Sequence, residues 1–223
     1  MTNETLKTPR TTLKRLPDRG HHDFETIASI LDEGLVCHLG FVTDGQPFVV
    51  PTSYGRDDRT LYIHGSSASR MLRTLAQGVP MCLTVTLIDG LVFARSVFHN
   101  SANYRSVVVL GTAEEATGDE KLHGLHVITE HLTPGRWAEA RQPAAQELKA
   151  STVLKLPIDE ASAKVRTGGP KEDPADLPSA LWAGVLPFAT TVQPAIADPD
   201  VPPGTNVPAY VAAYQRPRNG ARP

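Results

Sequence analysis

The chain has 223 residues, of which 40% are hydrophobic and 21% are charged, and its formal net charge is −2. These values are ordinary for a globular protein and provide no broad attraction to nucleic acid or to an anionic membrane. No apolar run approaches the ~20 residues that span a bilayer, and the N-terminus lacks the apolar centre of a signal peptide. We therefore expect a cytoplasmic protein with no nucleic-acid or membrane partner.

Composition divides the chain into three parts. Residues 1–20 are polar, carry five scattered basic residues and show no periodicity, so we expect a mostly flexible N-terminal arm. Residues 191–223 are dominated by Pro, Ala and Gly, which predicts a disordered or surface-hugging tail. Residues 21–190 are expected to form one folded domain.

The first part of this domain predicts a helix followed by short strands. Asp23 can cap a helix that ends near Gly34. The run LVCHLGFV, the turn at Asp44–Gly45 and the run FVVPTSY then indicate a β-hairpin. A second turn leads into a third strand that ends at His64. Three short antiparallel strands in succession favour a barrel or sandwich.

After His64 the pattern changes from strand to helix through a turn rich in Gly and Ser. Ser66, Ser67 and Ser69 supply hydroxyl groups there, and Arg70 could hold an anion with two hydrogen bonds. Because the start of a helix also attracts negative charge, a phosphate site is one hypothesis for this turn. The alternative is that Ser66 or Ser67 only caps the helix while Arg70 points to solvent.

Polar residues then crowd between two strand patterns in residues 89–111. An apolar strand from Pro80 ends at Asp89–Gly90, which we interpret as a hairpin turn, and the β-branched run Val107–Val109 marks the next strand. Side chains held between strands are the usual material of a binding site, although a solvated loop is the alternative. The polar residues of this insert are Arg95, Ser96, His99, Ser101, Asn103, Tyr104 and Arg105.

The remainder predicts one long helix and one further strand. The helix begins at Asp119, and His123 and His126 share one of its faces. Because no zinc motif surrounds them, we expect solvated or hydrogen-bonded imidazoles and no metal site. The run STVLKLPI is the last clear strand and ASAKVRTGGPKEDP is interpreted as a loop. The apolar run from Trp182 to Phe188 must dock on the core, a second subunit or a ligand.

Absent motifs narrow the function. The chain has no G-x-G-x-x-G, P-loop, G-x-S-x-G or Cys-x-x-Cys pattern. A dinucleotide-binding Rossmann fold, P-loop nucleotide hydrolysis, α/β-hydrolase chemistry and thiol exchange are therefore not favoured.

Several motifs together resemble a known family. LDEGLVCHLGFV, LYIHGSSASRML, DGLVFARSVFHNSANYRSVVVLG, SAKVRTGGP and WAGVLP occur in the order typical of the flavin-nucleotide-binding branch of the pyridoxamine 5′-phosphate oxidase-like split-barrel family. The resemblance covers roughly residues 15–190. It implies a mainly β protein with flanking helices, built on a six-stranded antiparallel split β-barrel. It also implies a homodimer that holds FMN between its subunits.

The resemblance also assigns candidate cofactor-binding residues. The residues implied to hold the flavin phosphate are Ser66, Ser67, Ser69 and Arg70. Those implied to lie beside the ring system or to offer backbone contacts are Pro51, Thr52, Ile63 and His64. Those expected in part to reach the cofactor of the partner subunit are Arg95, Ser96, Ser101, Tyr104 and Arg105. Trp182 resembles the aromatic residue that closes the pocket.

Two departures separate the chain from the oxidases that make pyridoxal phosphate. Met71 stands where those enzymes carry a lysine after the phosphate-binding arginine, and no Arg-x-His motif follows Trp182. The resemblance therefore extends to the cofactor and not to pyridoxal phosphate synthesis.

The expected function is that of an FMN-dependent oxidoreductase acting on a small molecule, with His64 as the candidate for proton transfer. Reduction of nitroimidazoles is one specific form of this hypothesis. A carrier or sensor that binds flavin without turnover is an alternative. Haem binding by the same barrel is another, with His64 or His99 as the axial ligand.

Overall fold

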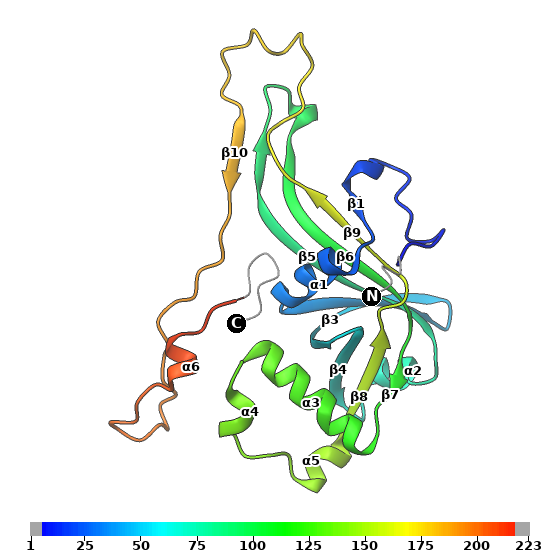
Figure 1. The fold of residues 1–223 in the computed structure, drawn as a ribbon, viewed down its shortest axis with the longest axis vertical. Coiled ribbons are helices and arrows are strands. Elements are labelled where there is room, and N and C mark those ends of the chain that lie inside the picture. Colours follow the sequence, from blue (N-terminus) through cyan, green and yellow to red (C-terminus); the bar gives the residue numbers. More distant parts are fainter. Residues whose placement is uncertain (1–5, 217–223) are drawn as a thin grey trace.

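The computed structural model describes residues 6–216, and it shows a mainly β protein with helices packed around an open, curved sheet (Figure 1). The strands are β1 (Gly20–His21), β2 (Val36–Thr43), β3 (Gln46–Asp57), β4 (Thr60–Ser66), β5 (Pro80–Phe93), β6 (Ser101–Thr112), β7 (Glu114–Glu115), β8 (Ser151–Pro157), β9 (Ala161–Arg166) and β10 (Gly184–Pro187). The helices are α1 (Phe24–Glu33), α2 (Arg70–Leu75), α3 (Gly118–Leu132), α4 (Arg136–Glu139), α5 (Ala145–Ala150) and α6 (Ala209–Ala212), with 3₁₀ turns η1 (Pro17–Arg19) and η2 (Val97–His99).

All strand pairs are antiparallel, in the order β1-β9-β6-β5-β2-β3-β4-β8-β7, with β10 on β5. The two ends of this order, β1 and β7, are not paired with each other, so the barrel is split rather than closed. The fold class is therefore the expected one. Over residues 6–216 the sheet holds ten strands in all: β1 and β9 extend one end of the order, β7 extends the other, and β10 lies off this order on β5.

Local sequence explains the first hairpin. In β2 the residues Cys37, Leu39 and Phe41 are buried and alternate with more exposed neighbours, as a half-buried strand requires. Asp44 (φ 52°) and Gly45 (φ 71°) both adopt the left-handed backbone that a tight two-residue hairpin needs. The predicted Asp-Gly turn between β2 and β3 is confirmed.

The helices cover the core of the barrel. Asp23 caps α1 by accepting a hydrogen bond from Thr26 N at 2.8 Å, and the buried side of α1 carries Ile27, Ile30 and Leu31. The longer helix α3 packs on β3, β4 and β8. Its Gly124 lies so close to Tyr62 and Val153 that an added Cβ would come within 2.8 Å of each.

The predicted turn at Asp89–Gly90 is wrong. Both residues lie inside β5, which continues to Phe93, and the register shifts between Ile88 and Gly90 as in a β-bulge. A Cβ on Gly90 would lie 2.6 Å from the carbonyl oxygen of Leu186, so the glycine allows β10 to approach β5. The chain reverses only in residues 94–100, which include η2.

Two segments near the C-terminus differ from the sequence-based expectation. The first six residues of the predicted loop ASAKVRTGGPKEDP form β9, which lies between β1 and β6. The apolar run after Trp182 forms β10, whose Gly184 pairs with Phe93 and whose Pro187 pairs with Gly90. The apolar run therefore docks on β5 of its own chain.

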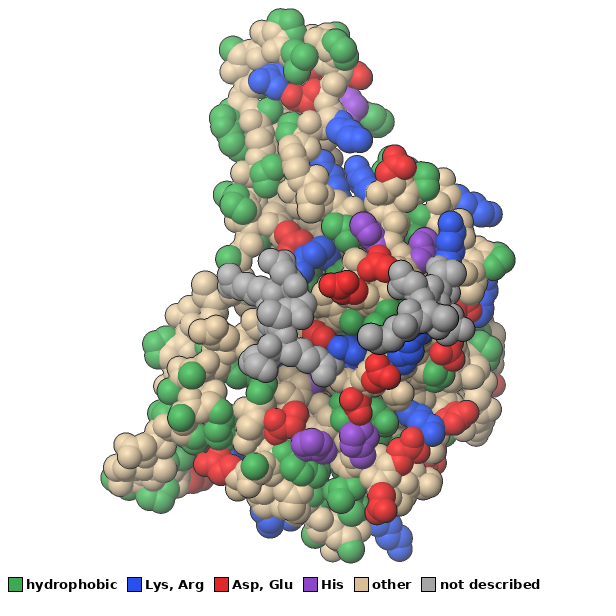
Figure 2. Space-filling view, in the orientation of Figure 1, with side chains coloured by type: hydrophobic (Ala, Val, Ile, Leu, Met, Phe, Trp, Pro, Cys, Tyr) green, Lys and Arg blue, Asp and Glu red, His purple; other side chains and the backbone are tan. Residues whose placement is uncertain are grey.

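Four neighbouring parts of the chain extend away from the barrel. They are the end of β5, the start of β6, the segment that follows β9, and the strand β10. We call residues 89–104 and 167–188 the projecting arm (Figure 1). Figure 2 shows hydrophobic side chains along this arm. Val97 and Phe98 are each 88% exposed, and Trp182 is 68% exposed with its ring centroid 5.8 Å from that of Phe93.

The terminal segments contact the barrel where the structure describes them. Of the flexible arm predicted for residues 1–20, residues 1–5 lie outside the described part, whereas Leu6 is buried in the core and its carbonyl accepts a hydrogen bond from Ala161 N. The tail follows the surface, and hydrogen bonds hold it there. Tyr214 Oη donates to Leu132 O, and Arg216 donates to Asp32 O at the end of α1. No helix among residues 6–216 is long and apolar enough to cross a membrane.

Candidate functional site

The barrel opens between β3 and β4. Their ladder runs from Asp57 opposite Thr60 to Tyr54 opposite Ile63 and ends there. Further along, β3 pairs with β2, and β4 pairs with β8. The facing edges of β3 and β4 therefore lack a strand partner in the described chain, and such edges leave backbone groups available to a ligand.

Four of the sequence-predicted residues flank this opening. Pro51 and Thr52 lie on β3 just before the ladder, and His64 and Ser66 lie on β4 just after it. Pro51 is exposed, while Thr52 is half-buried and accepts a hydrogen bond from Cys37 Sγ. Ile63 is 2% exposed and its side chain belongs to the core, so it can offer a ligand only its backbone.

His64 carries an unusual buried atom. Its Nδ1 is inaccessible to solvent and has no hydrogen-bond partner among residues 6–216. Burial lowers the pKa of this imidazole below its ordinary value of about 6.5, so the ring is neutral at neutral pH. Because buried polar atoms are seldom left unpaired, His64 fits a site that receives a further polar group.

The serine-rich turn connects β4 to α2. Ser69 caps α2 by accepting a hydrogen bond from Leu72 N at 3.4 Å, so the predicted cap at Ser66 or Ser67 is wrong. Ser66 Oγ accepts from Ala68 N at 3.2 Å, and Ser67 N donates to Ala150 O at 2.9 Å. Ser66 and Ser67 are both exposed, so their hydroxyl groups remain able to donate to an anion.

Arg70 stands beside this turn as an exposed cation. Its guanidinium lies 4.4 Å from the centroid of the Phe48 ring, and Phe48 in turn stacks on Phe41 at 5.6 Å. The guanidinium is thus exposed, as the predicted alternative has it, and it is held in place by stacking on Phe48. Within residues 6–216 no carboxylate pairs with Arg70, and stacking leaves its N–H edges available.

The residues at this opening fit a phosphate-bearing flavin. The turn offers serine hydroxyls and an unpaired guanidinium for the phosphate, and His64 offers an unpaired ring nitrogen. The structure therefore brings together the predicted residues from Pro51 to Arg70.

The predicted residues beyond position 90 lie elsewhere in the chain. Arg95 pairs with Glu172, Ser96 caps η2 by accepting from Phe98 N, and Ser101 is exposed at the start of β6. These three residues and Trp182 belong to the projecting arm, so one chain does not bring them to the serine-rich turn.

Arg105 is held between two carboxylates. It donates to Glu33 at 2.5 and 2.9 Å and to Asp89 at 3.0 and 2.8 Å. The hydrogen bonds that Arg105 donates to Glu33, and then those that it donates to Asp89, raise the pKa of the guanidinium. With both partners in place, Arg105 fixes α1 to the base of the projecting arm. Its neighbour Tyr104 is half-buried, opposite Ile88 and Arg166.

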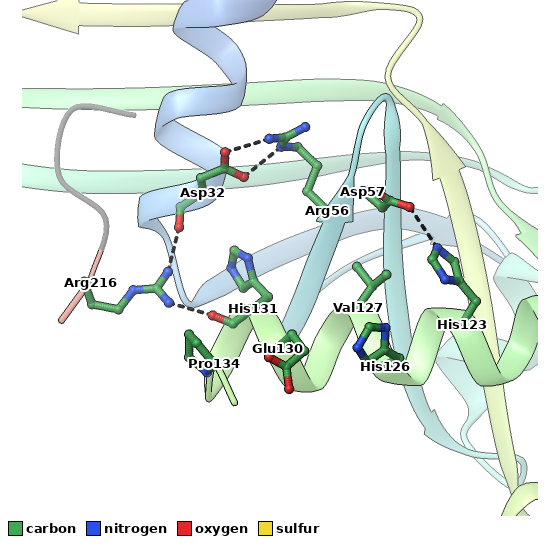
Figure 3. A pocket seen from close by; sticks show the side chains of 10 residues that line it. All are labelled: Asp32, Arg56, Asp57, His123, His126, Val127, Glu130, His131, Pro134 and Arg216. Carbon is green, nitrogen blue, oxygen red and sulfur yellow. Dashed lines mark hydrogen bonds and ion pairs between the residues drawn. The ribbon is translucent and has the colours of Figure 1, made fainter. Parts of the chain in front are cut away.

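A separate pocket of about 280 Å³ lies between α1, α3, the end of β3 and the tail (Figure 3). Asp32 pairs with Arg56 and His123 pairs with Asp57 at its wall, and Arg216 joins Asp32 O to His131 O. None of the predicted cofactor-binding residues lines it. No local pattern in the sequence predicts this pocket, because its residues come from four separated segments.

Metal-ligating side chains gather at one place in the described chain, where His99, Asp173 and Asp176 approach one another on the projecting arm. His99 Nε2 lies 3.3 Å from Asp173 Oδ2, which is an ordinary exposed pair. His123 and His126, with ring centroids 6.4 Å apart, form no such group.

Comparison with solved structures finds two close relatives over most of the chain. The flavocytochrome Anf3 from Azotobacter vinelandii is 40% identical, with a TM-score of 0.87, over 93% of this chain and 97% of its own. A FAD- and heme-binding protein from Mycobacterium smegmatis is 37% identical, with a TM-score of 0.84, over 86% of this chain and 95% of its own.

A more distant relative is a candidate 5-nitroimidazole antibiotic resistance protein from Bacteroides thetaiotaomicron VPI-5482. It is 26% identical, with a TM-score of 0.56, over 66% of this chain and 86% of its own. A comparison with curated proteins finds no match.

The family model described as pyridoxamine 5′-phosphate oxidase matches residues 23–165. The match spans more than half of the chain and includes the barrel opening and the serine-rich turn. Fold, motif order and family model agree, and the chain belongs to the pyridoxamine 5′-phosphate oxidase-like split-barrel family.

Proposed function

We propose that this protein binds a flavin nucleotide at the opening between β3 and β4. The phosphate would lie at the turn of Ser66, Ser67, Ser69 and Arg70, and the ring system beside Pro51, Thr52 and His64. The observation that carries this proposal is the exposed guanidinium of Arg70, which has no carboxylate partner in the described chain and adjoins two exposed serines. A phosphate would supply the missing anion.

We propose FMN as the flavin, because the turn offers one built phosphate position. FAD is the alternative that the relative from Mycobacterium smegmatis supports. Mass spectrometry of the compound released from the denatured protein separates the two by mass.

The proposed site is completed by a second subunit. Val36, Val42 and Val49 on the outer face of β2 and β3 are 49%, 54% and 69% exposed, which is a substantial apolar surface for a single chain. A homodimer would cover this face and could bring Arg95, Ser96, Ser101 and Trp182 to the flavin of its partner. Light scattering of the flavin-loaded protein tests this, and a monomer with full flavin content would refute it.

The proposed activity is oxidoreduction of a small molecule. A bound flavin supplies transfer of electrons or hydride, while the chain supplies position and charge. His64 contributes a neutral imidazole whose Nδ1 can accept a hydrogen bond from the flavin or substrate. Steady-state turnover with reduced nicotinamide and an acceptor, including a nitroimidazole, tests this activity. A flavin that no donor reduces would instead favour a carrier or sensor.

Haem binding is a second candidate function, favoured by the two relatives described as a flavocytochrome and as a FAD- and heme-binding protein. His64 suits an axial ligand better than His99, because His64 Nδ1 is unpaired while His99 Nε2 contacts Asp173. The visible spectrum decides: a Soret band that disappears in His64→Ala supports haem at His64, and flavin bands alone refute it.

A further inference from the structure

Arg166, at the end of β9, is a buried cation without a counter-ion. It is 6% exposed, and no carboxylate pairs with it among residues 6–216. By contrast, Arg56, whose side chain is 8% exposed, forms a two-point pair with Asp32. Burial of a charge is costly unless a charge of opposite sign compensates it. Arg166 therefore requires a physical explanation.

Neutral oxygens satisfy part of its guanidinium. Nη1 donates to Asn103 Oδ1 and to Gly168 O, and Nη2 donates to Gly169 O at 3.2 Å. Nε makes no hydrogen bond to any residue of the described chain. Because a guanidinium has five N–H donors, donor capacity remains after these three bonds. These contacts fix the turn at Gly168–Gly169 without supplying negative charge.

Further donors gather around Arg166. Arg19 precedes β1, whose Gly20 pairs with Lys164 of β9, so Arg19 lies near the end of the same strand. Tyr104 is the register partner of Arg166 on β6. Arg19, Tyr104 and Lys164 are half-buried, and their side chains form no hydrogen bond or ion pair within residues 6–216. Burial, and then the charge of Arg19, lower the pKa of Arg166.

We propose that Arg19, Tyr104 and Arg166 form an anion subsite that takes a phosphate group of a nucleotide, separate from the turn at Ser66–Arg70. Tyr104 Oη and the Arg19 guanidinium would contact the phosphate directly, with Arg166 beneath them as a fixed positive charge. Lys164, two residues before Arg166 on the same face of β9, adds to the positive field. Arginine is well matched to phosphate because its donors bind two oxygens at once.

The subsite goes beyond the proposed flavin site. Two sources could supply such a phosphate: the adenylate half of FAD, or the phosphates of a nicotinamide dinucleotide that donates electrons. Either source would present a phosphate group to Arg19, Tyr104 and Arg166. The proposed flavin phosphate occupies a different part of the fold, so the two sites can be tested independently.

The test uses the full-length apoprotein and inorganic pyrophosphate as the probe, measured by isothermal titration calorimetry. An Arg70→Ala background removes the cation at the serine-rich turn. In that background we expect pyrophosphate binding to weaken at least about tenfold with Arg19→Gln, as expected for loss of one charge-assisted hydrogen bond. Tyr104→Phe is expected to weaken it by a smaller factor. Arg15→Gln, which removes an exposed arginine of the same segment, is the matched control.

Titration with FMN, FAD and NADPH then separates the sources. Weaker binding of FAD with unchanged binding of FMN in Arg19→Gln assigns the subsite to the adenylate half of FAD. Weaker binding of NADPH alone assigns it to the electron donor. Arg166 would be shown to serve only the Gly168–Gly169 turn if pyrophosphate binding, or the binding of both dinucleotides, is the same in Arg19→Gln as in the parent. These nucleotide titrations use Arg19→Gln with Arg70 intact, so that FMN binding at the serine-rich turn is scored separately from the subsite.

Discussion

Arg56 and Asp32 form a buried two-point ion pair that joins β3 to the end of α1. Nε lies 2.8 Å from Oδ1 and Nη2 lies 2.6 Å from Oδ2, and the two side chains are only 8% and 7% exposed. Figure 3 shows the pair at the wall of the pocket. Both charges are taken out of water there, so the stability of this corner depends on keeping both partners together.

Removal of one partner should therefore be costly. Arg56→Met leaves Asp32 buried without its cation, and we expect a loss of about 3–5 kcal/mol in the free energy of unfolding. Urea denaturation followed by circular dichroism measures the loss. Arg141→Met is the control, because Arg141 and its partner Glu147 are 70% and 52% exposed and such pairs contribute little. Equal effects of the two substitutions would contradict this description.

Gly90 should be needed for docking of β10. A Cβ there would meet Leu186 O at 2.6 Å and Pro187 Cα at 3.0 Å, and backbone atoms cannot move aside cheaply. In Gly90→Ala we expect amide hydrogen exchange in β10 to accelerate about tenfold or more, because local opening becomes easier. Gly169→Ala is the control, since nothing lies within 4 Å of a Cβ at that position. Unchanged protection of β10 in Gly90→Ala would show that the paired strands accommodate a Cβ at this position and that glycine is not needed there.

His64 should make folding stability depend on pH. Burial lowers its pKa in the folded state below the ordinary value of about 6.5 that applies to the unfolded chain. The unfolded chain therefore binds more protons between these two values, and stability falls as the pH drops through that window. His64→Gln removes this contribution. Urea midpoints from pH 8 to pH 5 should decline less steeply in the variant, and identical slopes would show that His64 protonates freely in the folded protein.

Local signals in the sequence predict much of the barrel and part of the site. The Asp23 cap, the Asp44–Gly45 hairpin and the Gly-Ser turn before Arg70 all depend on neighbours in sequence, and the structure has them in place. The Asp-Gly pair at positions 89 and 90 carries the same signal as the earlier hairpin. Residues 89 and 90 instead lie at a β-bulge inside β5, and the part of β5 that follows the bulge pairs with β10, almost a hundred residues later in the sequence.

Non-local pairing explains the other differences. The residues of β9 are rich in Ala, Lys and Arg and look like a loop, yet β1 and β6 pair with both of their edges. Arg105 lies in one of the motifs that resemble the family. In the structure it forms ion pairs with Glu33 and Asp89, and no local sequence pattern relates these two residues to Arg105. Arg166 carries no local signal in the sequence, because its burial without a counter-ion among residues 6–216 follows from contacts between distant segments.

Flavin content after Arg70→Ala substitution shows whether the serine-rich turn holds the flavin phosphate. The wild-type protein, Arg70→Ala and Arg59→Ala are loaded with FMN and passed through gel filtration, and bound flavin is measured by absorbance. Arg59 is the matched control, since its guanidinium lies 4.8 Å from the Phe24 ring centroid and resembles Arg70 in stacking while lying away from the serine-rich turn. We expect Arg70→Ala to lose most of its flavin, with affinity reduced at least about tenfold, and Arg59→Ala to keep it. Full flavin retention by Arg70→Ala would contradict the account.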